Sequence, residues 1–449
     1  MAEAKNIVLV VHYYPPINSS GAKRMEAMSK YFARWGRNVT VIAPRKGPID
    51  GAFTEHVPDG VHLIELDHFG RFSPTQVDEM ASGGQGFGPP QTGWFRSLKN
   101  FVMRQMGQLP DPRLPFALSF GGPTLAKEAR EALANADVVV GTCPPWPPLL
   151  AVLFAKKRYG VPAILDYRDQ LSMCHEMPGG KLAKKVEVIL DRWLTRRADM
   201  IVAISEPMRD YYADFHSDVI AILNGYDHEK LAEARRERPW RPRDSGQPAV
   251  IRYAGIITPG RIPRAMLTAL SRLHARGADL RSMTRFEYVG ECDLLRQFIA
   301  EHHPELQDLF HFLPRVSYAE SLHRIVSADF LLFCENGVSS REGHEASASG
   351  ILTTKLFEYL ASERPIIAEI SAESLAGSFI IKASHDHFVA TQAEQFERFF
   401  LSPDFQNPPV PEVGDFVLSL SREMQARQYL EAIDQVYGKT GGHENARSQ

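Results

Sequence analysis

Short apolar runs alternate with segments of helical periodicity through the first half of the chain. Residues 6–11 are a predicted strand with a continuous apolar run over 7–11, and a helical pattern then extends from Ala22 to Trp35 and stops at Gly36. The apolar run 39–43 comes next, so the pattern predicts a strand, a helix and a second strand. Because such a unit places its two strands parallel, the segment predicts the first crossover of a parallel sheet.

The same alternation predicts two successive domains. In the first half, further strands are predicted at 61–65, 137–141, 163–166, 200–204 and 219–222. In the second half, strands are predicted at 250–257, 285–290, 309–313, 329–334 and 365–369, and helices at 264–276, 294–303 and 318–328. A polar stretch rich in Pro and Arg, residues 227–247, joins the two series. We therefore predict an α/β protein with two Rossmann-like, doubly wound domains that face a cleft.

Chain length supports this division, since 449 residues exceed what one compact core holds. We predict an N-terminal domain over 1–224, a C-terminal domain over 225–420, and a terminal segment 421–449 whose helix packs back. Residues 69–115 form a long insertion, and within it 94–109 combine helical apolar spacing with basic residues and no acid. Such a helix either packs on its own domain or makes peripheral contact with an anionic membrane.

Composition narrows the class of protein. Hydrophobic content of 44%, charged content of 23% and a net charge of −3 describe a globular protein without a nucleic-acid-binding charge pattern. Four scattered cysteines, without metal-ligand spacing, indicate neither zinc nor a disulfide framework. No apolar run reaches the ~20 residues of a membrane-spanning helix, so we expect a cytoplasmic protein.

The most informative stretch is residues 350–368, GILTTKLFEYLASERPIIA. A glycine turn leads into a short helix that Thr353 or Thr354 can cap, and a strand follows. Lys355 adds a positive charge at the helix start, where backbone N–H groups favour anions, and Glu358 lies one turn later on the same face. This combination suits a ligand with phosphates and hydroxyls, such as a nucleotide-sugar. The alternative is a surface helix with an ordinary i,i+3 ion pair.

Three other polar clusters follow predicted strands. They are Asn18-Ser19-Ser20-Gly21, Asp166-Tyr167-Arg168-Asp169, and Gly255 with Arg261 and Arg264. Ligands of open α/β sheets bind at the carboxyl ends of the strands, so each cluster is a candidate contact for a phosphate or a sugar. The alternatives are a turn glycine in the first cluster, an internal salt-bridge network in the second, and a solvated arginine in the third.

These residues together resemble the retaining GT-B glycosyltransferases of family 4, the glycosyl transferases group 1, over nearly the whole chain. The similar segments are Tyr14-Pro15-Pro16 through Gly21 with Arg24, Asp166-Tyr167-Arg168-Asp169, Ser205-Glu206, Asn224-Gly225-Tyr226-Asp227, and Lys355-Leu356-Phe357-Glu358-Tyr359-Leu360-Ala361 with Arg364-Pro365. The last segment is the most specific, and the others occur in the family's order.

The resemblance implies where the substrates bind. The nucleotide-sugar donor would lie mostly in the C-terminal domain, with Glu358 on the ribose hydroxyls and Lys355 near the donor. Arg261, assisted by Arg264, would contact the diphosphate, and the backbone of Gly350, Ile351 and Leu352 would lie beside the sugar. The acceptor would lie mostly in the N-terminal domain, where Gly21 lets the backbone close over the phosphates and Arg168 and Asp169 are the catalytic candidates.

Two positions depart from the family's pattern. Gly350 stands where members often carry a first glutamate. The role of that glutamate could pass to the backbone amides of residues 350–352, pass to Glu342 or Glu345, or be absent. Arg168 stands where many members carry a histidine. No Asp-X-Asp sequence occurs, so we expect no metal and no other cofactor.

The resemblance implies a metal-independent, retaining transfer of a sugar to a glycan or lipid-linked acceptor in bacterial surface polysaccharide or glycoconjugate synthesis. The alternatives are a nucleotide-sugar epimerase or hydrolase of the same fold, and a catalytically silent member that acts as a binding partner.

Overall fold

The computed structural model describes residues 3–19, 21–46, 55–67, 109, 111, 113–172, 180–244, 246–335, 350 and 352–444, the last four of these by backbone only. The chain divides into two compact units. One contains Met1–Leu223, Arg341–Gly350 and Gln425–Gln449, and the other contains Asn224–Ser340 and Ile351–Met424. Residues 94–108 of the predicted helix, together with Glu342, Glu345 and Ile351, lie outside the described residues.

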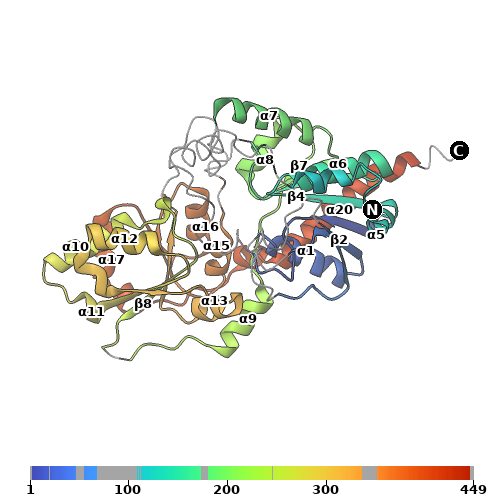
Figure 1. Ribbon diagram of the computed structural model, residues 1–449. Helices are drawn as coiled ribbons and strands as arrows, with labels where there is room; N and C mark the ends of the chain where they lie inside the picture. Colours follow the sequence, from blue (N-terminus) through green and yellow to red (C-terminus); the bar gives the residue numbers. More distant parts are fainter. Residues whose placement is uncertain are drawn as a thin grey trace, which may run out of the picture. The chain divides into compact units, whose positions relative to one another are not determined.

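The first unit is built on a parallel sheet with the order β3-β2-β1-β4-β5-β6-β7. Its strands are β1 (Asn6–Val10), β2 (Asn38–Pro44), β3 (Val61–Leu66), β4 (Val138–Cys143), β5 (Ala163–Tyr167), β6 (Met200–Ala203) and β7 (Val219–Ala221). Its helices are α1 (Lys23–Arg34), α4 (Leu114–Ser119), α5 (Lys127–Ala134), α6 (Pro147–Tyr159), α7 (Lys181–Thr195), α8 (Glu206–Ala213) and most of α20 (Arg422–Glu444). Figure 1 shows these elements from blue to green, with α20 in red.

Alternate residues of the strands enter two separate cores, as expected for a sheet covered on both faces. Val8 and Val10 of β1 join a core that contains residues of α6, whereas Ile7 and Leu9 join one that contains residues of α1. Helix α20 contributes to the second core through Ala426, Tyr429, Leu430, Ile433 and Val436, so the terminal helix belongs to the hydrophobic interior of the first unit.

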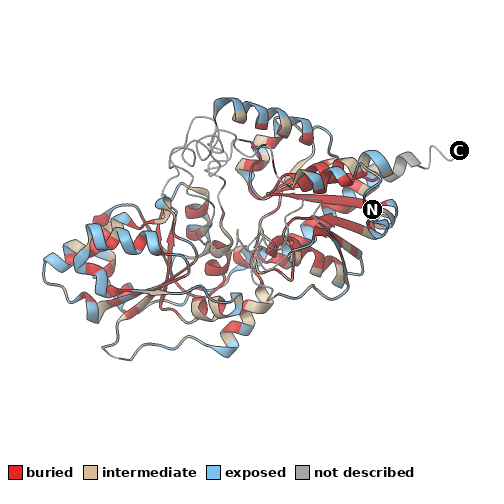
Figure 2. Cartoon of the chain, in the orientation of Figure 1, coloured by how far each residue is buried: buried red, intermediate tan, exposed pale blue. Residues whose placement is uncertain are grey.

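The second unit has a parallel sheet with the order β10-β9-β8-β11-β12-β13. Its strands are β8 (Ala249–Ala254), β9 (Thr284–Val289), β10 (Phe310–Leu313), β11 (Phe330–Cys334), β12 (Ile366–Glu369) and β13 (Phe388–Ala390). Its helices are α9 (His228–Glu237), α10 (Arg264–Ala275), α11 (Leu280–Met283), α12 (Asp293–His302), α13 (Tyr318–Val326), α15 (Thr354–Leu360), α16 (Leu375–Ala383), α17 (Ala393–Phe400), α18 (Pro403–Gln406) and α19 (Asp415–Ser419). Figure 2 shows the buried strands between more exposed helices.

The two parallel sheets confirm the predicted α/β class with two doubly wound domains. The polar stretch 227–247, however, is not simply a linker. It contains α9, whose first turn is capped by Asp227, and Trp240 stacks on Arg364 while its indole N–H donates to Asp329 at 3.1 Å. A helix with few apolar positions gives a weak periodic signal, which explains why the pattern missed it.

Among the described residues, no helix is both long enough and apolar enough to cross a membrane. Cys143, Cys292 and Cys334 are buried free thiols.

Candidate functional site

The strand order of the second sheet identifies where a ligand would bind. The chain runs outward from β8 through β9 to β10, and then returns to the other side of β8 with β11, β12 and β13. The order therefore reverses between β8 and β11, and a crevice at the carboxyl ends of these two strands is the usual ligand position in such sheets. Lys355, Arg261 and Glu335 meet at this point.

Lys355, in the first turn of α15, is half-buried and points to the end of β8. Its ammonium donates a hydrogen bond to the hydroxyl of Tyr253 at 2.5 Å and lies 4.0 Å from the centre of that ring. The Tyr253 hydroxyl in turn donates to the carbonyl of Ile256 at 2.9 Å. Burial, with the nearby positive charge of Arg261, lowers the pKa of Lys355 to about 7. The lysine is therefore poised to gain a proton when an anion arrives.

Arg261 follows β8 in a single turn of 3₁₀ helix, Pro259–Arg261. Its guanidinium donates to Glu335, directly after β11, through Nε at 3.1 Å and Nη2 at 2.8 Å to the same oxygen. Both side chains are mostly buried, at 18% and 11% exposure. A predicted phosphate contact thus carries a carboxylate partner that the sequence did not suggest. When Lys355 is protonated, these two cations exceed the one carboxylate among the described residues that meet at the switch point.

Glu358, one turn after Lys355, is buried and accepts a hydrogen bond from the hydroxyl of Tyr318 at 2.8 Å. Tyr318 begins α13, and its pKa is raised by burial and by the adjacent carboxylate. Lys355 and Glu358 are thus directed to different partners, Tyr253 on β8 and Tyr318 on α13, and the alternative of a simple surface helix does not describe them.

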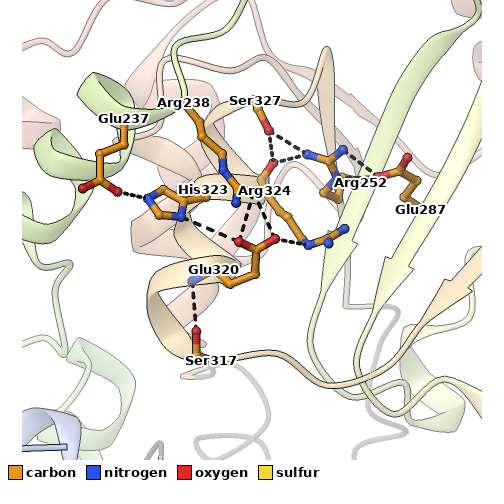
Figure 3. Close-up of polar contacts among 9 residues, drawn as sticks. All are labelled: Glu237, Arg238, Arg252, Glu287, Ser317, Glu320, His323, Arg324 and Ser327. Carbon is orange, nitrogen blue, oxygen red and sulfur yellow. Dashed lines mark hydrogen bonds and ion pairs between the residues drawn. The ribbon is translucent and has the colours of Figure 1, made fainter. Parts of the chain in front are cut away.

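A polar network holds α13 in place beside α9 and β8 (Figure 3). His323 contacts Glu237 of α9 at 2.6 Å, and Glu320 accepts from Arg324 at 2.9 Å and from Arg238 at 3.0 Å. Arg252 of β8 donates to Glu287 of β9 and to the carbonyl of Arg324 at the end of α13. These contacts fix the helix that carries Tyr318, and with it the carboxylate of Glu358.

A pocket of about 280 Å³ opens at the carboxyl ends of β9 and β10. Its lining residues are Gly290, Cys292, Asp293, Arg296, Phe312, Leu313 and Pro314. Gly290 has φ +128°, and a Cβ there would lie 2.4 Å from the carbonyl oxygen of Gly255, so only glycine allows β8 and β9 to end so close together. The Cys292 thiol contacts the same carbonyl at 3.8 Å. The pocket therefore lies next to Gly255, at the end of β8 to which Lys355 points.

The remaining predicted donor contacts lie in different environments. Arg264 is exposed at the start of α10 and stacks on Phe298, 4.5 Å from the ring centre. Glu369 at the end of β12 accepts from the N–H groups of Ala265 and Met266, so a carboxylate of the protein already occupies that helix start. Gly350 and Leu352 are buried.

The predicted threonine cap of α15 is wrong. Thr353 occupies the N-cap position, but its side chain makes no capping hydrogen bond, and its buried hydroxyl has no hydrogen-bond partner.

The first sheet reverses its order between β1 and β4, and Arg168 lies at that point. Its guanidinium donates to the carbonyl of Gly21, in the segment after β1, at 2.5 Å and to the carbonyl of Pro144 after β4. A Cβ on Gly21 would lie 3.0 Å from both Arg168 Nη1 and the Tyr13 ring, which gives this glycine a packing reason. Burial lowers the pKa of Arg168.

The two aspartates of the Asp-Tyr-Arg-Asp cluster have different environments. Asp166 is fully buried and pairs with Arg24 at 2.8 Å, while Thr142 donates to its second oxygen at 2.9 Å. Arg24 also donates to the carbonyl of Leu223 at 2.7 Å. This aspartate therefore supports the first unit's interior, as the salt-bridge alternative predicts. Asp169 is exposed, and its negative charge lies close enough to Arg168 to offset part of the lowering of the Arg168 pKa by burial.

Among the described residues, no group of three or more His, Cys, Asp or Glu side chains is arranged to hold a metal ion.

Known protein families and solved structures are similar to this chain in sequence or in fold. Residues 21–225 match the glycosyl transferase 4-like domain family. The chain has the GT-B fold. No curated protein sequence matches this chain.

Three solved structures are similar over nearly their whole length. A glycosyltransferase from Rickettsia africae is 14% identical, with 96% of this chain and 98% of that chain covered and a TM-score of 0.53. The sucrose-phosphate synthase of Thermosynechococcus elongatus is 11% identical, with 98% of each chain covered and a TM-score of 0.55. HepE of Anabaena, solved with UDP and glucose, is 12% identical, with 98% of this chain and 100% of that chain covered and a TM-score of 0.51.

Proposed function

We propose that the protein is a glycosyltransferase that transfers a sugar from a nucleotide-sugar to a glycan or lipid-linked acceptor, without a metal ion and with retention of configuration. The observation that carries the proposal is the meeting of Lys355, Arg261 and Glu335 where the second sheet reverses its strand order. A cationic cluster at such a position suits a diphosphate. We propose that the enzyme acts in the cytoplasm, in bacterial surface polysaccharide or glycoconjugate synthesis.

The parts of the donor correspond to neighbouring features of the second unit. The pocket at the ends of β9 and β10 has the aromatic ring of Phe312 for a nucleobase. Glu358 offers a carboxylate oxygen for the ribose hydroxyls, and Tyr318 orients that carboxylate. The diphosphate then lies against Lys355 and Arg261. The UDP and glucose in the HepE structure support a nucleoside diphosphate sugar as the donor class.

Positive side chains would then stabilise the leaving group in place of a metal ion. The acceptor hydroxyl oxygen forms a bond to the anomeric carbon while the bond from that carbon to the diphosphate oxygen breaks. The hydroxyl proton passes to the departing diphosphate, which leaves on the face that the acceptor enters. Lys355 is half protonated near pH 7 and becomes fully charged as negative charge accumulates beside it.

Gly21, Arg168 and Asp169 are proposed to serve the sugar and acceptor side of the reaction. Arg168 directs its charge to the segment that contains Gly21, so it would position that backbone, and Asp169 is exposed for contact with a hydroxyl. Gly350, Ile351 and Leu352 are proposed to lie beside the donor sugar. Arg264, which stacks on the Phe298 ring, is proposed as a further phosphate contact.

Product analysis with purified enzyme, donor sugars and candidate acceptors tests this function. We expect a glycosylated acceptor with the donor's anomeric configuration, turnover unaffected by EDTA, and loss of turnover in Glu358→Ala. As a control, Glu397→Gln alters another buried glutamate, on α17, that pairs with Arg276 at 2.8 Å, and it should retain activity. Donor hydrolysis or epimerisation without an acceptor would favour the enzyme alternative, and absence of nucleotide-sugar binding would favour the silent binding partner.

A further inference from the structure

Helix α7 of the first unit has an inverted distribution of polar and apolar residues. Its two acidic residues, Glu187 and Asp191, are fully buried, with Leu194 and Thr195 beside them. Its large apolar residues are exposed instead: Leu182 at 77%, Ile189 at 67%, Val186 at 44% and Trp193 at 40%. Figure 2 shows exposed positions along this helix. A helix that served only its own domain would have the opposite arrangement.

The exposed apolar residues form one continuous stripe. At 100° per residue, positions 182, 186, 189 and 193 fall within an arc of about 60°, and at 1.5 Å per residue they extend over about 16 Å. The buried acids, Glu187 and Asp191, lie on roughly the opposite side of the helix. The stripe is therefore one face of α7, directed away from the buried acids.

The buried side of α7 is firmly attached. Asp191 accepts hydrogen bonds from Tyr167 at 2.9 Å, from the Ser172 hydroxyl at 2.6 Å and from Tyr212 at 3.3 Å. Glu187 pairs with Lys184 at 2.9 Å. If α7 turned its apolar stripe inward, these contacts would break and the buried polar groups would lose their hydrogen bonds, which is unfavourable. The stripe is built to face outward.

Positive charge borders the stripe. The exposed basic residues of the helix and of the turn that follows it are Lys181, Lys185, Arg192, Arg196 and Arg197. Residues 181–197 contain no acid other than the two buried ones. Lys185, Arg192 and Arg196 lie along one flank by the same angular count, and Arg197 stacks on Trp193 from the other side, 4.2 Å from the ring. The exposed surface is thus apolar along its centre and cationic along its edges.

We propose that α7 is a docking surface for an anionic lipid bilayer. Long basic side chains beside a stripe of Leu, Val, Ile and Trp match the interface of such a bilayer, where apolar groups enter the acyl boundary and cations meet lipid phosphates. The residues of this surface are different from residues 94–109 and from the candidate catalytic residues. It would hold the first unit at the membrane, where a lipid-linked acceptor is available, and in this respect it extends the proposed function.

Flotation of the full-length protein with lipid vesicles tests the surface. We expect binding to vesicles of phosphatidylcholine with 30% phosphatidylglycerol, little binding to pure phosphatidylcholine, and weakening with added salt. Leu182→Ser/Ile189→Ser should lower the partition coefficient at least tenfold, and Lys181→Gln/Lys185→Gln should lower it several-fold. The control Leu401→Ser/Val410→Ser changes two exposed apolar residues of the second unit, at 57% and 49%, and should bind as the wild type does. Circular dichroism melting confirms that each variant is folded.

Two results would overturn the proposal: no binding of the wild type to anionic vesicles, or undiminished binding of the Leu182/Ile189 variant. Quenching of tryptophan fluorescence by brominated lipids identifies the surface independently, because Trp193→Phe should remove most of the quenching and Trp94→Phe should not. Dimerisation that the Leu182/Ile189 variant abolishes, without vesicle binding, would assign the stripe to a second copy of the chain instead. Loss of vesicle binding with unchanged soluble-donor binding separates this proposal from the proposed function.

Discussion

The ammonium of Lys355 lies 4.0 Å from the centre of the Tyr253 ring and donates a hydrogen bond to the hydroxyl of the same residue. These two contacts hold the Lys355 side chain at the point where the second sheet reverses its strand order. Its burial lowers its pKa to about 7, so its charge depends on what binds beside it.

Nucleotide affinity should depend on pH through Lys355. Bound diphosphate raises the pKa of the lysine, so binding above pH 7 requires uptake of a proton. We expect Kd to rise by nearly tenfold per pH unit above pH 7 until the pKa of the complex is reached, about 1.4 kcal/mol per unit. Titration calorimetry between pH 7.0 and 8.5 measures this slope, and Lys355→Met should bind weakly with no slope. A flat pH dependence in the wild type would refute the role of Lys355.

Opposite effects are expected from the two members of the Arg261–Glu335 pair. Arg261→Gln removes a cation and leaves a mostly buried carboxylate beside the phosphates, so nucleotide binding at pH 6 should weaken by about tenfold or more. Glu335→Gln removes the competing carboxylate, so binding at the same pH should tighten several-fold. The check is the pair of dissociation constants, and weakening in both variants would mean that Glu335 orients Arg261 rather than competing for it.

Gly290→Ala should destabilise the second unit by at least about 2 kcal/mol more than Gly277→Ala. Both glycines have positive φ, +128° and +85°, so both substitutions strain the backbone. Only at Gly290 does the added Cβ meet a neighbour, the carbonyl of Gly255 at 2.4 Å, whereas at Gly277 nothing lies within 4 Å. Urea unfolding of the two variants gives the difference, and equal losses would show that the close approach of β8 and β9 does not matter.

Asp191 should make the stability of the first unit depend on pH. Burial raises its pKa to about 6, from 3.8, despite the hydrogen bonds it accepts. The folded state thus holds a proton between these values that the unfolded state has lost, so this contribution to stability is present at low pH and is lost as pH rises through 6. Between pH 7.5 and 5.0 the wild type should gain about 1.4 kcal/mol relative to Asp191→Asn.

Urea unfolding of wild type and Asp191→Asn at the two pH values provides the measurement. Asp210→Asn, an exposed aspartate on α8, is the matched control and should show no such difference. A gap between wild type and Asp191→Asn that stays constant with pH would contradict the assignment.

Periodicity and turn residues were sufficient to predict most of the fold. The strand prediction 163–166 corresponds to β5, and the helix prediction 264–276 to α10, within one residue at each end. Such elements have apolar faces that local sequence records directly. Strand β13 has three residues, and α9 has few apolar positions, so neither element has a periodic signal of its own.

The sequence predicts site residues that lie together in one segment. It does not predict contacts between residues of distant segments. The spacing of Lys355 and Glu358 marked α15 as a candidate. Nothing near Glu335 or Tyr318 in the sequence indicates that these side chains contact Arg261 and Glu358, because those contacts depend on the sheet order. The inverted distribution of polar and apolar residues on α7 was missed for the same reason. Its buried Asp191 accepts hydrogen bonds from Tyr167, Ser172 and Tyr212, which lie in other segments of the sequence.

We predict that a nucleotide-sugar binds where β8 and β11 end, with Lys355 on its diphosphate. Thermal shift of wild type, Lys355→Met and Lys382→Met against UDP-, GDP-, ADP- and dTDP-sugars tests it most directly. Lys382 is an exposed lysine that also lies over an aromatic ring, Phe416, at 4.2 Å, so its variant controls for loss of a lysine–ring contact. At ligand concentrations 100-fold above Kd, binding stabilises the fold by about 2.7 kcal/mol, enough to raise Tm by several degrees. We predict such a rise with one donor class in wild type and Lys382→Met, and its loss in Lys355→Met; an equal rise in all three proteins, or none in the wild type, would contradict the claim.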